Sequence, residues 1–123
     1  MIIGRNIIVS IITPDGDVDI LAKVDTGAFS SSIDESFFKS LNLKEDVLKN
    51  KLVRNVHGTE QRPVYDIDII VKEKKISSEL NVFDRSKMKY KMILGRKDIE
   101  KLDAMVNIKI SEKAKKKKQF GVQ

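Results

Sequence analysis

The sequence contains no cysteine and only one histidine, His57, in 123 residues. Without cysteine it can form no disulfide, no thiolate zinc site and no cysteine nucleophile. A single histidine excludes a multi-histidine metal site, and a Ser–His triad would have to use His57. A Gly-x-x-x-x-Gly-Lys phosphate loop is also missing, so nothing points to ATP binding. We therefore expect a protein that needs no metal and no cofactor.

Long apolar runs are missing as well. The longest nearly apolar run, Ile7–Ile12, is interrupted by Ser10 and is far too short to span a bilayer. The first residues lack the charged segment and long apolar segment of a signal peptide. These features predict a protein without membrane contact that resides in the cytoplasm.

Positive charge is concentrated at the C-terminus. The chain has 24 basic and 18 acidic residues, and lysines within 113–118 account for five of the six net positive charges. We expect one folded domain over residues 1–112, close to neutral, and a basic flexible tail over residues 113–123. The tail is interpreted either as a solvated end or as a weak, salt-dependent contact for nucleic acid or anionic surfaces. No aromatic residues are interleaved among the lysines, so base stacking is not indicated.

Short runs of alternating apolar residues predict a mostly-β domain. Asn6–Ile12 and Asp17–Val24 flank the turn sequence Pro14-Asp15-Gly16 and predict a hairpin. Two short helices are expected, one capped by Asp34 and one over residues 97–104. The other predicted strands cover residues 51–56, 63–71, 76–83, 92–94 and 105–110. About seven strands and two helices are expected in total.

The most specific local motif is Asp25-Thr26-Gly27-Ala28, which directly follows an apolar strand. Alone, Asp-Thr-Gly is typical of a surface turn, in which Asp caps backbone N–H groups. A second apolar strand, Met92–Leu94, also runs into a glycine and then a helix. The chain thus contains two similar half-units, and only the first carries a carboxylate.

This layout resembles the retropepsin-like aspartic proteases, and more narrowly the bacterial and archaeal retropepsin-like proteins labelled ATP-dependent zinc proteases. The resemblance covers roughly residues 5–110. It is carried by Asp25-Thr26-Gly27-Ala28 with Ser31-Ser32, Arg62-Pro63-Val64, Asp84-Arg85-Ser86 with Met88 and Tyr90, and Ile93-Leu94-Gly95-Arg96. It implies a small, closed, barrel-like β subunit with two short helices that forms a two-fold symmetric dimer.

The resemblance also implies a catalytic mechanism. One carboxylate cannot serve as both general acid and general base, so a homodimer would pair Asp25 with its copy across the two-fold axis. Two carboxylates this close share one proton. Thr26 would hydrogen-bond across the axis, Gly27 would let the substrate backbone approach, and Ala28 would line the cleft. Such a site needs neither a covalent intermediate nor a metal.

The resemblance assigns further roles around the site. The polar segment His57-Gly58-Thr59 would form the tip of a flap over the cleft. Gly95 and Arg96 would be structural residues near the site. Related subunits carry a carboxylate partner for this arginine just after the alanine, but Phe29 occupies that position here. We therefore expect Arg96 to bond backbone carbonyls or Asp34.

Some alternatives stay open from sequence. His57 is an exposed loop residue in the simpler interpretation, and Asp84-Arg85 is either a family motif or a surface turn. The favoured function is an aspartic endopeptidase that hydrolyses peptides or proteins. The alternatives are a non-catalytic dimeric peptide-binding module of the same fold and a basic nucleic-acid-associated protein.

Overall fold

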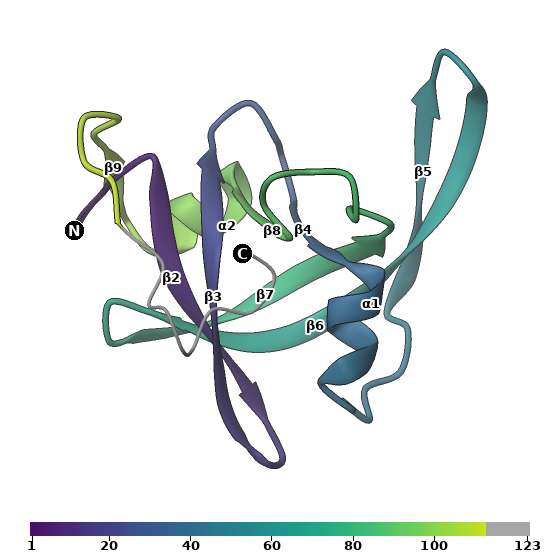
Figure 1. Cartoon of the computed structure of the whole chain (residues 1–123), viewed down its shortest axis with the longest axis horizontal. Helices are drawn as coiled ribbons and strands as arrows, with labels where there is room; N and C mark the ends of the chain where they lie inside the picture. Colours follow the sequence, from purple (N-terminus) through teal and green to yellow (C-terminus); the bar gives the residue numbers. More distant parts are fainter. Residues whose placement is uncertain (113–123) are drawn as a thin grey trace.

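The computed structural model describes residues 1–112, and the predicted tail over 113–123 lies outside these residues. Within them the chain is mostly β, with nine strands and two helices (Figure 1). The strands are β1 (Ile2–Ile3), β2 (Asn6–Thr13), β3 (Gly16–Asp25), β4 (Ser31–Asp34), β5 (Lys49–Asn55), β6 (Gly58–Val71), β7 (Lys74–Phe83), β8 (Met92–Gly95) and β9 (Met105–Val106). The helices are α1 (Glu35–Ser40) and α2 (Arg96–Lys101). No helix in the described part of the chain is long and apolar enough to cross a membrane.

Six of the strands close into a barrel. The strand order is β2-β3-β8-β4-β7-β6-β5, and β2 also pairs with β6 through Ser10–Ile70 and Ile11–Ile69. That extra pairing joins the two ends of the sheet, while β5 lies outside the closed ring as a partner of β6 alone. The expected mostly-β, closed barrel with two short helices is confirmed.

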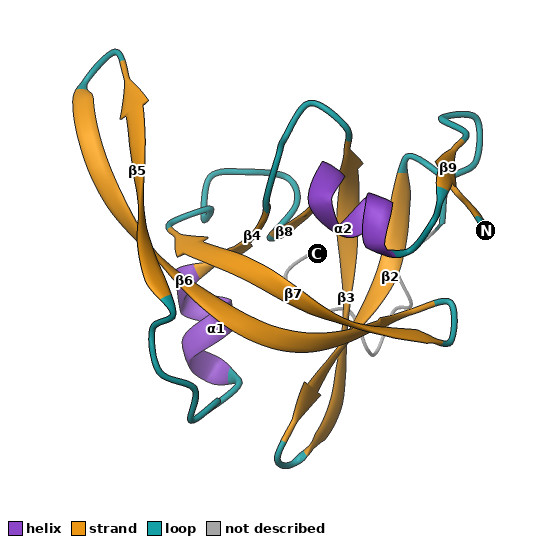
Figure 2. Cartoon of the chain, turned by 180° about the vertical axis from the view of Figure 1, so that it is seen from behind, coloured by secondary structure: helices purple, strands orange, loops and turns teal. Residues whose placement is uncertain are grey.

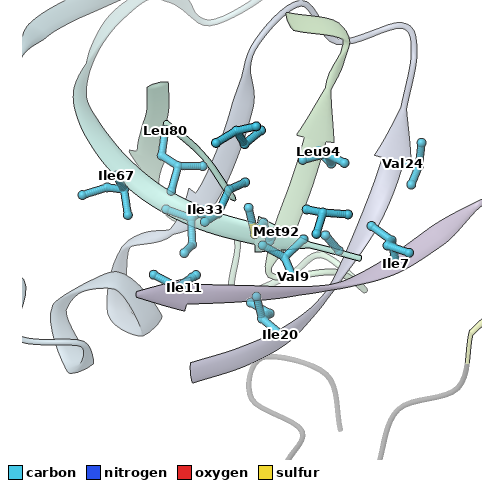
Figure 3. Packing of buried hydrophobic residues seen from close by; sticks show 14 of the residues in the cluster. Ile7, Val9, Ile11, Ile20, Val24, Ile33, Ile67, Leu80, Met92 and Leu94 are labelled. Carbon is cyan, nitrogen blue, oxygen red and sulfur yellow. The ribbon is translucent and has the colours of Figure 1, made fainter. Parts of the chain in front are cut away.

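The barrel encloses an aliphatic core. Side chains from β2, β3, β4, β6, β7 and β8 point inward and contact one another (Figure 3). Ile7, Val9 and Ile11 alternate along β2, as the two-residue period of a strand requires. This core fixes the relative positions of β3 and β8, the two strands that end beside the candidate site.

Segments near the two ends of the described residues pair with each other, which sequence patterning does not predict. β1 and β9 form a parallel two-stranded sheet, with Ile2 opposite Met105. The predicted strand over residues 105–110 is wrong beyond Val106, because the chain turns there and Ile110 N–H donates to the Asn107 carbonyl. The Ile110 carbonyl then lies so close to Gly4 that a Cβ at that position would lie 2.2 Å from it.

Both helices are short and lie near their predicted positions. Asp34 caps α1 as predicted, with its carboxylate accepting the Phe37 N–H at 3.1 Å. The second predicted helix, over 97–104, ends earlier, at Lys101. The Leu102 N–H closes the last turn onto the Asp98 carbonyl, and Asp103 adopts a positive φ of 52°. Capping geometry therefore ends α2 before the apolar spacing does.

Candidate active site

Asp25 is the last residue of β3 and lies at an end of the barrel. It pairs in register with Gly95, the last residue of β8. One carboxylate oxygen of Asp25 accepts the Gly27 N–H at 3.0 Å, and the side chain is 29% exposed. Lys23 Nζ lies 4.0 Å from the other oxygen, a solvated pair that contributes little. The carboxylate is therefore oriented by its own loop and remains open to a partner.

The loop after Asp25 is fixed by the start of α2. Backbone N–H groups of Arg96 and Lys97 donate to the carbonyls of Ala28 and Phe29, at 2.8 and 3.0 Å. The Arg96 guanidinium also donates to the Thr26 carbonyl at 3.3 Å. Helix starts leave N–H groups without intrahelical acceptors, and here the Asp25 loop supplies the acceptors. Arg96 thus bonds a backbone carbonyl.

The β5–β6 hairpin projects away from the barrel like an arm (Figure 1). Its strands pair from Lys49–Val64 to Asn55–Gly58, which leaves Val56 and His57 as the turn. The turn therefore lies one residue earlier than the predicted tip, and Gly58 and Thr59 belong to β6. Val56, which sequence reasoning missed, is 95% exposed. The sequence does distinguish Val56, because it is an apolar residue flanked by the polar residues Asn55 and His57.

A cavity of about 190 Å³ lies between the Asp25 loop and the base of this hairpin. Phe29 and Ser30 of the loop line one side. The other lining residues come from β5, β6, β7 and α2: Lys49, Asn50, Lys51, Val64, Glu79, Asn81 and Lys97. A larger cavity of about 400 Å³ is lined by Pro14, Leu43 and Asp66 but by no residue of the Asp25 loop. Of these two cavities, the smaller is the one lined by residues that follow Asp25 in the chain, Phe29 and Ser30.

Comparison with known proteins identifies a family for this chain. The sequence profile of the RimB-like family, described as retropepsin-like aspartic endopeptidase RimB, matches residues 38–117, more than half of the chain. The chain belongs to this RimB-like family. No curated protein matched the sequence.

Two solved structures have the same fold as this RimB-like chain. A protein of unknown function (DUF785) from Legionella pneumophila is 24% identical, with a TM-score of 0.64, covering 89% of this chain and 94% of that one. EIAV protease in complex with the inhibitor HBY-793 is 21% identical, with a TM-score of 0.63, covering 86% of this chain and 94% of that one. At these identities the likeness establishes the retropepsin-like fold, which the sequence motifs predicted.

The RimB-like match begins after the Asp25 loop. It covers the hairpin, the segment around Arg85 and the Gly95–Arg96 segment, but not Asp25-Thr26-Gly27-Ala28. The role of Asp25 in this RimB-like chain therefore depends on its position beside Gly95 and on the motif. Among residues 1–112, no three His, Cys, Asp or Glu side chains converge where they could hold a metal ion.

Arg85 in the RimB-like chain is buried, at 4% exposure, whereas its neighbour Asp84 is exposed. The Arg85 guanidinium donates to the Tyr90 carbonyl and its backbone N–H donates to Asp34. Burial lowers the pKa of Arg85, and the charge of Arg62 lowers it further. Asp34 thus accepts from the Phe37 N–H of α1 and from Arg85, and of the two partners expected for Arg96 the structure shows the backbone carbonyl, that of Thr26.

Glu79 forms ion pairs that link the base of the β5–β6 hairpin to α2. Its carboxylate contacts Lys49 Nζ at 2.7 Å and Lys97 Nζ at 2.8 Å. Hydrogen bonds from Lys49 and then Lys97 lower the pKa of Glu79 from 4.5 to about 2. Because the folded pKa is depressed, this stabilisation is present above the unfolded pKa and is lost as pH falls towards the folded one.

We expect Glu79→Gln to lower the free energy of unfolding by about 1 kcal/mol near neutral pH, after allowing for solvent screening. The difference from wild type should shrink below about pH 4.5 and vanish only below about pH 2, where the wild-type carboxylate also becomes neutral. Urea unfolding across this range measures it. Glu45→Gln, in an exposed loop, is the control, and a pH-independent difference would contradict the role of the Glu79 charge.

Proposed function

We propose that this chain is an aspartic endopeptidase whose site is completed by a second copy of itself. The observation that carries the proposal is the position of Asp25, partly exposed at the end of β3 and oriented by Gly27. Peptide hydrolysis by direct attack of water needs a general base and a general acid. The sequence holds one Asp-Thr-Gly motif, so the second carboxylate comes from a partner subunit.

One face of the molecule supports this dimer. The end of β3, the tip of the β5–β6 hairpin and β9 lie on the upper side in Figure 1, and again when the chain is seen from behind (Figure 2). Segments at this face carry exposed large apolar side chains: Ile2, Phe29, Val56, Met105 and Ile108. Exposed apolar side chains on segments that lie on the same side of the molecule as the end of β3 are typical of an interface.

In this dimer the two Asp25 carboxylates share one proton, because like charges at such close range do not ionise together. The ionised one removes a proton from a bound water, and the protonated one donates to the scissile carbonyl oxygen. The water oxygen forms a bond to the carbonyl carbon as the C=O π bond opens, which gives a gem-diol. The first carboxyl then donates the proton taken from water to the amine nitrogen as the C–N bond breaks, and the other carboxylate takes a proton from a gem-diol hydroxyl as the C=O bond re-forms. The cavity beside Phe29 and Ser30 would hold a neighbouring substrate side chain.

The β5–β6 hairpin would act as the flap that excludes water once substrate is bound. We expect Val56→Ser at its tip to lower kcat/KM by roughly tenfold, mainly through KM, because an apolar contact over the substrate is lost. Steady-state kinetics on a cleaved peptide measures this. Val47→Ser, at another exposed valine outside the hairpin, is the matched control. An equal loss in both variants would contradict a flap role for Val56.

Sedimentation of the purified chain, together with peptide-library cleavage between about pH 4 and 7, tests the proposal, since carboxylate dyads operate on the acid side of neutrality. A dimer that cleaves and binds a statine-type transition-state mimic supports it. A strict monomer would overturn it, because one chain holds half a site. A dimer that binds peptides without cleaving them would instead fit the non-catalytic peptide-binding module. The expected cytoplasmic location stays a prediction.

A further inference from the structure

The start of α2 has no capping side chain of its own. Gly95 is the N-cap, and it makes no side-chain cap hydrogen bond. Instead, the Gly95 N–H donates to Ser31 Oγ at 2.9 Å, while the next two N–H groups donate into the Asp25 loop. The hydroxyl of Ser31 therefore joins the end of β8 to the end of the loop.

Asp98, in the first turn of α2, is a buried carboxylate that the proposed chemistry does not use. It is 1% exposed, and its Oδ2 accepts hydrogen bonds from Ser31 Oγ and Ser78 Oγ, each at 2.5 Å. Ser31 lies at the start of β4 and Ser78 lies in β7. One carboxylate oxygen thus joins a helix, the strand that follows the active-site loop, and a barrel strand.

The chemistry of a hydroxyl makes these contacts interdependent. Ser31 Oγ has one proton, which it donates to Asp98, and this orientation leaves a lone pair for the Gly95 N–H. The Ser31 carbonyl accepts from Asn81 Nδ2 at 2.9 Å, so the backbone at this position is held as well. Without an acceptor at position 98 the Ser31 side chain is no longer held in this rotamer, and each change of rotamer leaves the buried Gly95 N–H without its partner.

We propose that Asp98 is a positioning residue for the Asp25 loop, an inference that rests on the proposed endopeptidase function. Asp98 fixes the Ser31 hydroxyl, the hydroxyl fixes Gly95, and Gly95 is the register partner of Asp25. Displacements of about 1 Å at a catalytic group cost up to about 100-fold in rate. Asp98 would therefore control turnover without touching substrate.

Ser31 and Ser78 form a matched pair for the test. Both are buried serines that donate to the same oxygen of Asp98, but only Ser31 also accepts from Gly95. We expect Ser31→Ala and Ser78→Ala to destabilise the fold by similar amounts. Only Ser31→Ala should also accelerate hydrogen exchange at the Gly95 amide and lower kcat.

Asp98 is tested directly by two substitutions in the full chain. Asp98→Ala should lower kcat by about 10- to 100-fold with KM changed less than about threefold, and should speed exchange of the Gly95 amide beyond the global unfolding rate. Asp98→Asn should restore most of both properties, because a carboxamide oxygen still accepts two hydroxyls. Exchange is measured residue by residue by NMR, and global stability by urea unfolding.

The proposal is overturned if Ser31→Ala and Ser78→Ala change Gly95 exchange equally, or if Asp98→Ala leaves that exchange unchanged. Should Asp98→Ala fail to fold, the comparison of Gly95 exchange in Ser31→Ala and Ser78→Ala still decides the proposal. If the wild-type chain hydrolyses no peptide, the endopeptidase proposal fails. The exchange data would then still decide whether Asp98 holds the loop, so the two failures are distinguishable.

Discussion

Asp25→Asn is expected to abolish peptide hydrolysis while leaving the fold and the dimer intact. Removing the general base and acid together should lower kcat by at least about 1000-fold, the upper part of the range for acid–base catalysis. The asparagine carboxamide oxygen can still accept the Gly27 N–H, and the side chain is partly exposed, so little stability is lost. Cleavage assays, sedimentation and urea unfolding on the same preparation separate these effects. Asp15→Asn, at the exposed β2–β3 turn, is the matched control.

Mixed dimers make this prediction more specific. If both subunits contribute Asp25 to one site, an equal mixture of wild-type and Asp25→Asn chains that exchange freely should retain about one quarter of the wild-type activity, since only wild-type pairs work. If each chain carries its own complete site, about one half should remain. The second result would contradict a dyad shared across the two-fold axis even if Asp25 proved essential.

Much of the barrel could be predicted from local sequence. Alternating apolar residues locate β2, β3, β6 and β7, and Asp34 marks the start of α1 because its side chain caps a helix in any context. The β1–β9 pair could not be predicted, since two-residue strands have no period to detect. Its existence depends on tertiary contacts between segments more than 100 residues apart, including the close approach of Ile110 to Gly4.

The candidate site also contains residues that the sequence predicts and residues that it does not. Asp25-Thr26-Gly27-Ala28 and Gly95 are readable as motifs because their residue types are fixed by local geometry. The burial of Asp98 and of Arg85 is not readable, although Arg85 belongs to a motif of the resemblance, since nothing in the sequence separates a buried charged side chain from the many exposed ones. Their roles depend on partners distant in sequence, such as Ser31 for Asp98 and Asp34 for Arg85.

Gly95→Ala is expected to have the second large effect, on stability as well as on activity. A Cβ at this position would lie 2.4 Å from the carbonyl carbon of Ser30 and 2.5 Å from its oxygen. These are backbone atoms of the segment that follows the Asp25 loop, and β8 lies between β3 and β4, so neither side can move freely. We expect the free energy of unfolding to fall by about 3 kcal/mol or more, as measured by urea unfolding.

Gly16→Ala separates this steric effect from the general cost of replacing a glycine. Gly16 has a φ of +117° and open space around it, so its replacement should cost about 1 kcal/mol in backbone strain and leave activity unchanged. Gly95 has a φ of −89°, which any residue adopts, so its substitution acts through contact alone. If Gly95→Ala is no more destabilising than Gly16→Ala, the close packing of β8 against the Asp25 loop is contradicted. A larger loss at Gly95 would mean that the glycine is required because the backbone of the Asp25 loop must lie directly against it. One half-unit of the barrel would then hold the Asp25 loop of the other in place.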